Sequence, residues 1–452
     1  MCSTAIIIVV HMMGDYETMD RAKLIEKLIE RDKKIEFLEK ELSKYKNPNT
    51  PSSSNKHIKP DTNGLQSKEG AKRGAPNGHK GTTRNQEANR KMVIDAQSCP
   101  NCNSTRVVDK TILKRVIDEI VEAPEPETIE AEIHKKVCKD CGLVFIPRDN
   151  TIPLQGKFGT NIMVLVILIK FVLRGVLRKT ASFLDDGFAL KMTPAAVNAI
   201  VKRVADAAEM EYAKIKERIR IADKIYVDET SFSVLGLNQW VWVFRTSQDI
   251  LLVIRPSRGS NVLEEILGKS YAGTIICDCW RAYNFLSNAH IQRCWAHLLR
   301  KSKDLSDLNS IVGRHFHAKL KALFEEIKTF NASNPTQEQR NTKYEAMTRE
   351  LKKLTTYYSR YDSLIGVVKY INFNIGNWFT CVKIAGIEPT NNFAEQAIRE
   401  TVMIRKIIGA FRSETGKENY EILASLIASW QLKDMDIQEE LKSMLVRNLC
   451  LS

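Results

Sequence analysis

The sequence lacks the long apolar segment that a membrane-spanning protein needs. Its longest apolar run, from Ile162 to Leu177, is interrupted by Lys170 and Arg174. It therefore falls short of the ~20 uninterrupted apolar residues of a spanning helix. The apolar stretch Ile6 to Val10 is short and follows no basic residue, so it does not fit a signal peptide. Both absences argue against a membrane or secreted protein.

Cysteine is not used as in a disulfide scaffold. Of the 10 cysteines, four form two Cys-x-x-Cys pairs and six show no pairing pattern. This usage fits a reducing compartment and a metal site better than a disulfide framework.

The chain has fewer acidic than basic residues. The chain has 68 Lys and Arg against 54 Asp and Glu, a formal net charge of +14 over 452 residues. Basic residues outnumber acidic ones nine to three in 47–91, twelve to six in 151–220 and fourteen to eight in 298–380. Such a surplus favours a polyanionic partner, most often nucleic acid. The alternative is a basic protein without such a partner. The length suggests about three domains.

The first 91 residues contain no predicted globular domain. Residues 1–14 are expected to be disordered or a mis-assigned start. The segment 15–46 has a heptad pattern, which predicts a coiled coil for self-association, with an amphipathic helix packed on its own chain as the alternative. Its apolar positions are Leu24, Leu28, Ile35, Leu38, Leu42 and Tyr45. Residues 47–91 are polar and aperiodic, which predicts a basic flexible linker.

A zinc ribbon is predicted over 92–150. Two Cys-x-x-Cys pairs can supply four thiolates at the corners of a tetrahedron, the geometry that structural Zn²⁺ prefers. The ligands are Cys99, Cys102, Cys138 and Cys141. Residues 106–109 and 128–137 are predicted to be β-rich. The alternative is a pair of cysteine turns without metal.

Helices are predicted over 151–220. Thr193 is a good N-cap and Pro194 suits the first helical position. A short helix, a turn at Gly187 and a longer helix to about Arg218 resemble a helix-turn-helix, although ordinary helical hairpins share this pattern. This segment is therefore predicted to be a helical DNA-binding domain.

From residue 221 the period becomes that of strands. Strands are predicted at 225–228, 239–246, 250–254, 274–277 and 291–294, with turns at Leu235-Gly236 and Ser247-Gln248 and a helix at 261–267. Three strands, a helix and further strands have the order of a ribonuclease-H-like core. Its first part covers 221–297, a helical insertion 298–380, and C-terminal helices 381–452. The predicted fold class is thus multidomain α/β, a ribonuclease-H-like mixed sheet preceded by a coiled coil, a zinc ribbon and a helical domain.

Three acidic residues stand where such a core carries metal ligands. Asp228 ends the first strand, Asp278 ends the fourth, and Glu395 lies on a later helix. Carboxylates suit Mg²⁺ or Mn²⁺, and two such ions can activate an attacking oxygen and stabilise a leaving one. Glu229 is a rival to Asp228, although strand alternation points it away.

Sequence motifs from about Asp20 onward resemble those of insertion sequence 66 family transposases, of the DDE superfamily. They include the Cys-x-x-Cys pairs, 73–81 (Arg-Gly-Ala-Pro-Asn-Gly-His-Lys-Gly), 227–230 (Val-Asp-Glu-Thr), 294–297 (Cys-Trp-Ala-His) and 391–399 (Asn-Asn-Phe-Ala-Glu-Gln-Ala-Ile-Arg). The resemblance implies Asp228, Asp278 and Glu395 as a catalytic triad that binds two Mg²⁺ or Mn²⁺ ions. The chain departs from the family pattern at Gln396 and Ile407.

The resemblance also implies the partners. It predicts binding to the element's terminal inverted repeats and to target DNA, strand cleavage and transfer, homo-oligomers through the coiled coil, and a cytoplasmic location near a prokaryotic nucleoid. The candidate DNA contacts are Arg73, Lys80, Arg258, Arg399, Arg405 and Lys406, and solvation at the surface is the equal alternative for Arg258, Arg399 and Arg405. The alternatives are a DNA-binding regulator on an inactive nuclease core and a ribonuclease-H-like repair nuclease.

Two further motifs are open to interpretation. Cys294 and His297 have metal-like spacing but supply only two ligands, so a structural contact is favoured over a metal site. Trp240, Trp242 and Trp280 are expected in the core, whereas Trp295 is a better candidate for stacking on an unpaired base.

The ribbon predicts about one structural Zn²⁺ per chain. Metal analysis of the full chain, purified without chelator, should find this ion. Because structural zinc contributes much of a small domain's folding energy, Cys99→Ser should release the ion and unfold the ribbon. A wild-type protein without zinc would contradict the prediction.

Overall fold

The computed structural model describes Val93 and residues 95–98, 100–108, 126–149, 151–307 and 311–451. The chain divides into two compact units, Met1–Pro126 and Glu127–Ser452. In the first unit, the described residues form a turn at 100–102 and irregular chain. The predicted coiled coil over 15–46 and the linker over 47–91 lie outside the described residues, as do Arg73 and Lys80.

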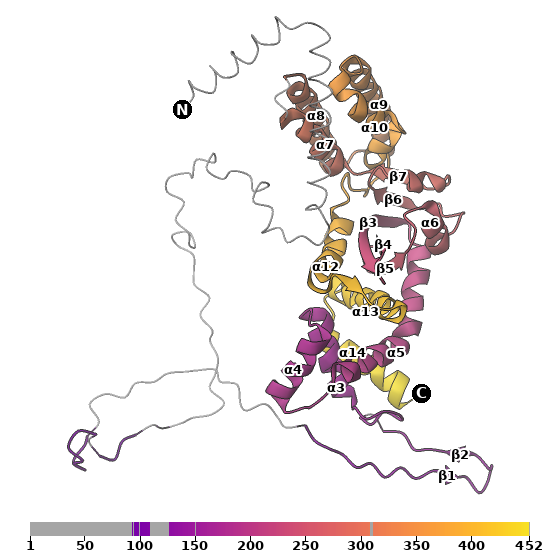
Figure 1. Ribbon diagram of the computed structural model, residues 1–452. Helices are drawn as coiled ribbons and strands as arrows, with labels where there is room; N and C mark the ends of the chain where they lie inside the picture. The colour runs from indigo at the N-terminus through magenta and orange to yellow at the C-terminus, as the bar shows by residue number, and fades with distance from the viewer. Residues whose placement is uncertain are drawn as a thin grey trace, which may run out of the picture. The chain divides into compact units, whose positions relative to one another are not determined.

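A mixed β-sheet lies at the centre of the second unit (Figure 1). Its strands are β3 (Lys224–Val234), β4 (Leu237–Arg245), β5 (Ile250–Arg255), β6 (Thr274–Cys277), β7 (His290–Arg293) and the short β8 (Ala410–Phe411). The order is β5-β4-β3-β6-β7, with β8 paired to β3. The first three strands are antiparallel, whereas β6 pairs parallel with β3 and with β7. The predicted mixed α/β architecture is confirmed.

The β3–β4 hairpin turns as the sequence predicts. Val234 pairs with Leu237, so that Leu235 and Gly236 alone form the turn, with φ angles of 52° and 82°. Two consecutive left-handed residues make the tight turn that matches strand twist, and glycine adopts this conformation without a steric penalty.

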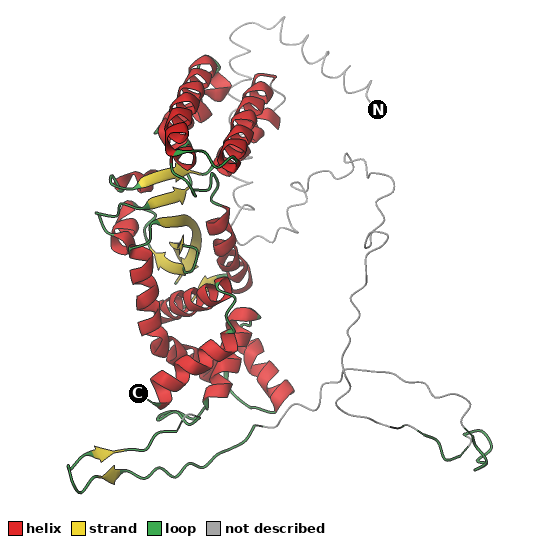
Figure 2. Cartoon of the chain, turned by 180° about the vertical axis from the view of Figure 1, so that it is seen from behind, coloured by secondary structure: helices red, strands yellow, loops and turns green. Residues whose placement is uncertain are grey.

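Helices flank the sheet and extend beyond it (Figure 2). Before the sheet come α3 (Thr160–Ile167), the π-helix η3 (Leu168–Val172), α4 (Leu177–Phe188) and α5 (Pro194–Arg220). Within the sheet's connections lie α6 (Ser260–Leu267) and the 3₁₀ helix η4 (Arg281–Phe285). After β7 come α7 (Trp295–Asp307), α8 (Ile311–Ala332), α9 (Gln337–Tyr358), η5 (Asp362–Leu364), α10 (Ile365–Asn372), η6 (Ile375–Trp378) and α11 (Thr380–Lys383). The last are α12 (Asn392–Ile408), α13 (Glu414–Leu432), α14 (Ile437–Leu445) and η7 (Val446–Cys450).

Helix α5 begins where the sequence predicts. The Thr193 hydroxyl accepts a hydrogen bond from the backbone N–H of Ala196 at 3.2 Å, and Pro194 is the first helical residue. The turn predicted at Gly187 is wrong, because that glycine lies inside α4. The chain turns instead at Ala189, whose φ is 52°.

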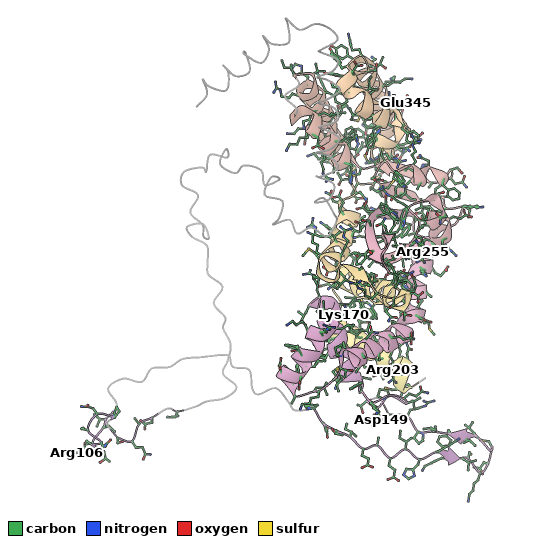
Figure 3. All side chains as sticks on the ribbon, in the orientation of Figure 1. Arg106, Asp149, Lys170, Arg203, Arg255 and Glu345 are labelled. Carbon is green, nitrogen blue, oxygen red and sulfur yellow. The ribbon has the colours of Figure 1, made fainter. Side chains whose placement is uncertain are left out.

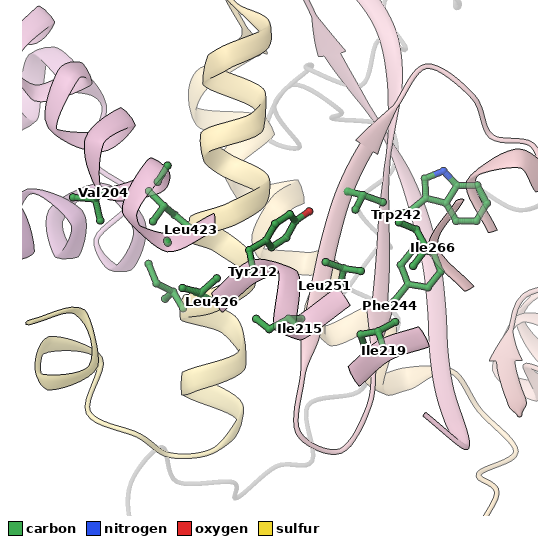
Figure 4. Packing of buried hydrophobic residues seen from close by; sticks show 14 of the residues in the cluster. Val204, Tyr212, Ile215, Ile219, Trp242, Phe244, Leu251, Ile266, Leu423 and Leu426 are labelled. Carbon is green, nitrogen blue, oxygen red and sulfur yellow. The ribbon is translucent and has the colours of Figure 1, made fainter. Parts of the chain in front are cut away.

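Helix α5 shares one hydrophobic core with the sheet. Tyr212, Ile215 and Ile219 are buried on the helix face that meets the strands, as Figure 4 shows. The Tyr212 hydroxyl donates to the carbonyl of Leu252 at 3.0 Å, so the polar tip of the ring is satisfied.

The helical insertion after β7 packs around a second hydrophobic core, to which the sheet also contributes. Its largest buried side chains include Trp295, Phe316 and Trp378, which belong to a cluster that also holds Ile276 of the sheet. Glu345 of α9 lies on the outer surface, whereas Arg255 lies at the sheet (Figure 3).

Only a short hairpin represents the predicted ribbon strands. Strands β1 (Lys136–Val137) and β2 (Val144–Phe145) pair around the turn that follows Cys138, with Gly142 at a φ of 72°. The prediction of β-rich segments at 106–109 and 128–137 is wrong for most of the residues that the structure describes there. Residues 106–108 and 128–135 form no strand.

Within the described part of the chain, no helix combines the length and apolarity needed to cross a membrane.

The edge strand β5 is covered by side chains of α13. Its free N–H groups at Ile250, Leu252 and Ile254 donate to Ser429, Ser425 and Glu421 respectively, each at 2.9 Å. Four helical residues advance about 6 Å and two strand residues about 6.7 Å, so successive turns of α13 match alternate residues of β5. The unpaired edge that would otherwise template aggregation is thereby closed.

We expect Ser425→Ala to lower the free energy of unfolding by about 1–2 kcal/mol, because it leaves the buried N–H of Leu252 without an acceptor. Denaturant unfolding measures this loss. As a control, Ser182→Ala on the exposed face of α4 should have little effect or stabilise slightly, since alanine favours helix. Equal stability of both variants would contradict the role assigned to Ser425.

Candidate active site

Asp228 and Asp278 lie side by side just past the parallel pairing of β3 with β6. The expectation that Asp228 ends its strand is wrong, because β3 continues to Val234 in antiparallel pairing with β4. Strands β3 and β6 pair in register, with Tyr226 opposite Ile276. Two residues further on, the chain reaches Asp228 on one strand and Asp278 just past the end of the other. Because side chains alternate along a strand, the two carboxylates project toward the same face of the sheet.

Glu395 reaches this face through helix α12, which packs against β3 and β4. The side chain of Asn391, at the start of the helix, is fully buried and donates from Nδ2 to the carbonyl of Val227 at 2.8 Å. This bond attaches the helix terminus to β3 directly beside Asp228. Glu395 follows in the first helical turn and is therefore held near the two aspartates.

The site concentrates negative charge. Burial, followed by the charges of Glu229, Asp278 and Glu395, raises the pKa of Asp228 from 3.8 to about 8. Burial disfavours the ionised form of a carboxyl group, and neighbouring carboxylates add repulsion. A divalent cation would supply the missing positive charge, and carboxylate oxygens are the ligands that Mg²⁺ and Mn²⁺ accept. The residues therefore fit such an ion.

The three acids are not the tightest group of possible ligands. Among the described residues, the three side chains whose ligand atoms lie within 4.8 Å of one another are Cys294, His297 and Glu395. His297 Nδ1 lies 3.5 Å from one carboxylate oxygen of Glu395, and Arg300 lies 3.7 Å from the other. Glu395 thus has neighbours on two sides, the aspartates and the start of α7.

Glu229 projects to the face of β3 opposite to Asp228, as strand alternation predicts. It remains close enough to interact electrostatically, because burial and the charge of Asp278 raise the pKa of Glu229. Its buried carboxylate accepts from Arg258 Nε at 2.9 Å and from the Tyr283 hydroxyl at 2.6 Å. The Arg258 guanidinium lies over the rings of Trp240 and Trp280, at 4.7 and 4.2 Å from their centroids. Arg258, predicted to contact DNA, thus shares its charge with Glu229 and retains less of it for a phosphate.

The Asp278 loop is fixed by a residue that sequence reasoning missed. Arg293 is fully buried and donates from Nη1 to the carbonyl of Asp278 at 2.5 Å and from Nη2 to Asn284 at 2.6 Å. The N–H of Trp280 donates to the Asp278 carboxylate at 2.8 Å. An arginine at the end of a strand has no motif, so only the fold reveals its role.

The remaining candidate DNA contacts on α12 differ in exposure. Arg399 and Lys406 are exposed. Arg405 is half-buried and donates to Thr230 at 3.1 Å and to the backbone of Ser231, while burial lowers its pKa. Arg405 therefore attaches α12 to β3, and DNA contact by these three residues stays a prediction.

Two expectations about tryptophan are wrong. Trp295 has no exposed surface, and its Nε1 donates to the carbonyl of Trp378 at 2.6 Å, so it cannot stack on a base. Trp280, expected in the core, is 38% exposed beside Arg258. Trp242 is buried as predicted.

The cysteines of the predicted ribbon are partly described. Cys138 and Cys141 lie in the second unit, on a turn where the N–H of Gly142 donates to the carbonyl of Cys138 at 2.9 Å. Hydrogen bonds from the backbone of Cys141 and Asp140 lower the pKa of Cys138, which favours the thiolate that zinc needs. Cys102 is exposed in the first unit, and Cys99 lies outside the described residues. The four-cysteine zinc site stays a prediction.

The sequence motifs predicted a transposase. A mixed sheet that brings Asp228 and Asp278 together fits this class of protein. The chain belongs to the IS66 family of transposases, since the family described as "Transposase IS66 family" matches residues 155–419, more than half of its length. The matched range runs from before α3 into α13 and includes Asp228, Asp278 and Glu395. The family resemblance inferred from the sequence is confirmed.

The chain is also similar to a protein of Sinorhizobium fredii whose name is "Uncharacterized protein y4hP". The two are 21% identical over 405 residues, which cover 80% of this chain and 72% of the relative. This likeness covers more of the chain than the family match does, but the relative's name states no activity.

The raised pKa of Asp228 predicts a stability that depends on pH. Between pH 3.8 and about 8, the unfolded chain has lost a proton that the folded protein keeps, so stability decreases as pH rises through this window. Asp228→Asn removes this penalty, and we expect it to raise the free energy of unfolding of metal-free protein at pH 7 by about 1–3 kcal/mol. Denaturant unfolding at pH 5 and pH 7 measures the effect.

Asp206→Asn on the exposed face of α5 serves as the control and should change stability little at either pH. Added Mg²⁺ should stabilise the wild type more than Asp228→Asn. An Asp228→Asn variant that is less stable than the wild type at pH 7, together with a wild type that Mg²⁺ does not stabilise, would contradict the electrostatic account.

Proposed function

We propose that this transposase binds the terminal inverted repeats of its own element and cuts and joins DNA strands with Asp228, Asp278 and Glu395 as ligands of divalent cations. The observation that carries the proposal is the parallel pairing of β3 with β6, which aligns Asp228 with Asp278. The negative charge of Glu395 is a further cause of the raised pKa of Asp228. The strand order β5-β4-β3-β6-β7 supports a ribonuclease-H-like core.

The proposed reaction has two steps of the same kind. Water attacks a phosphodiester at the element's end, and the bond from phosphorus to the 3′ oxygen breaks, which frees a 3′-hydroxyl. That hydroxyl then attacks a phosphodiester of target DNA, so one bond forms as another breaks. Two bound cations would activate the attacking oxygen and stabilise the leaving oxygen. No covalent bond between protein and DNA is needed.

The protein's own residues hold the acids in place for this chemistry. Asn391 fixes the start of α12 to β3, and Arg293 fixes the backbone of Asp278. Arg258 pairs with Glu229 and offsets part of the charge that this carboxylate exerts on Asp228. These contacts prepare the site before an ion or DNA arrives, which is how a fixed environment stabilises developing charge without reorganisation.

Exposed basic residues provide surfaces for DNA. In the helical insertion, Arg314, Lys319 and Lys321 on α8 and Lys352 and Lys353 on α9 are exposed. Contacts between such side chains and phosphates release counterions, so DNA affinity should fall steeply with salt. Self-association through 15–46, which would hold two element ends together, is part of the proposal.

Strand cleavage in vitro tests the proposal. With DNA that carries the element's ends, wild-type protein should nick in the presence of Mg²⁺, whereas Asp228→Ala and Glu395→Ala should bind the ends but cleave at least about 100-fold more slowly. Glu400→Gln, on the same helix and paired with Arg174 on the surface, should cleave normally.

Cleavage that persists in both acidic variants would overturn the assignment of these residues. Binding of the ends by a wild-type protein that never cleaves would instead favour the regulator, and cleavage without preference for the ends would favour a repair nuclease.

A further inference from the structure

A second group of possible ligands gathers where α7 begins. Cys294 lies between β7 and α7, and His297 follows in the first turn of that helix. Glu395 faces them from the first turn of α12, and the ligand atoms of the three side chains lie within 4.8 Å of one another. Cys294 and His297 alone supply only two ligands, and the fold brings the third from about a hundred residues away.

Two atoms of this group have no hydrogen-bond partner. His297 Nδ1 and Glu395 Oε1 are both inaccessible to solvent and neither makes a hydrogen bond, although they are 3.5 Å apart. Buried polar atoms in native proteins are nearly always satisfied, by protein, water or an ion. At 3.5 Å the two atoms do not form a hydrogen bond with each other, whereas a cation between them would satisfy both.

The sulfur of Cys294 has the surroundings of a metal thiolate. The backbone N–H of Asn391 points at Sγ, 3.1 Å away, and the N–H groups of Ala296 and His297 at the start of α7 also point to it. Burial raises the pKa of Cys294, and these three donors act against that rise. Donors and a helix N-terminus stabilise negative charge on sulfur, and hydrogen bonds around a ligand tune its metal.

We propose that Cys294 Sγ, His297 Nδ1 and the Glu395 carboxylate together bind one thiophilic divalent cation of the Zn²⁺ class. Sulfur, imidazole and carboxylate are ligands of Zn²⁺, whereas Mg²⁺ takes oxygen alone. Ligands around a tetrahedral zinc ion are roughly 3–4 Å apart, given its bond lengths. Three protein ligands leave a fourth position for water. This site is separate from the predicted four-cysteine ribbon.

The site shares Glu395 with the proposed catalytic triad. On the proposed function, a thiophilic ion at Cys294 therefore competes with the catalytic cations for this carboxylate. The binding itself does not depend on the function, because it is measured without DNA and without cleavage.

Cobalt substitution in the full-length protein tests the site. Metal-free wild type, loaded with Co²⁺, should show sulfur-to-cobalt charge-transfer absorption from this site in addition to that of the ribbon. Cys294→Ser should lose part of this absorption and about one equivalent of bound metal. Cys381→Ser, at a cysteine that is as buried as Cys294, is the matched control and should bind as the wild type does.

His297→Gln tests the site without disturbing the core, since this side chain is 28% exposed. It should lower the affinity for cobalt at this site by at least about tenfold. Wild type, Cys294→Ser and His297→Gln with equal cobalt content and identical spectra would overturn the proposal. If the wild type fails to cleave DNA but still binds more cobalt than Cys294→Ser and His297→Gln, the result would count only against the proposed function.

Discussion

Negative charge gathered where the parallel pairing of β3 with β6 ends is the constraint around which the rest of the site is arranged. Asp228 is buried beside other carboxylates, and its pKa rises to about 8 in consequence. Such an arrangement costs stability unless a cation or a proton compensates it. Arg258 pairs with Glu229 on the other face of β3, and Arg300 lies near Glu395. Asp228 and Asp278 are left for something else to neutralise, which is what a binding site for divalent cations requires.

The fold holds this unfavourable arrangement together from both sides of the sheet. Helix α12 is attached to β3 at Asn391, beside Asp228, and again at Arg405, beside Thr230 and Ser231. On the far edge, α13 satisfies the free N–H groups of β5. Because α12 cannot shift along β3, Glu395 is held against the repulsion of the aspartates. The position of α12 also places Glu395 next to Cys294 and His297. The Glu395 carboxylate therefore belongs to two groups of possible metal ligands.

Much of the central architecture could be predicted from the sequence, because local patterns determine it. The strand periods, the Leu235–Gly236 turn and the Thr193 cap all depend on neighbouring residues, and the structure has each of them. Long-range contacts could not be predicted in this way. Arg293 has no sequence pattern that marks it as the residue behind Asp278, and Trp295 carries no sign that the helical insertion will bury it.

The central claim is that Asp228, Asp278 and Glu395 together bind the divalent cations used in strand cleavage. The most direct test is anomalous diffraction from crystals of the full-length protein soaked in Mn²⁺. The account predicts anomalous density between these three carboxylates, absent in Asp228→Asn crystals. Density at other acidic residues, or none at these three while Mn²⁺ supports cleavage, would contradict it.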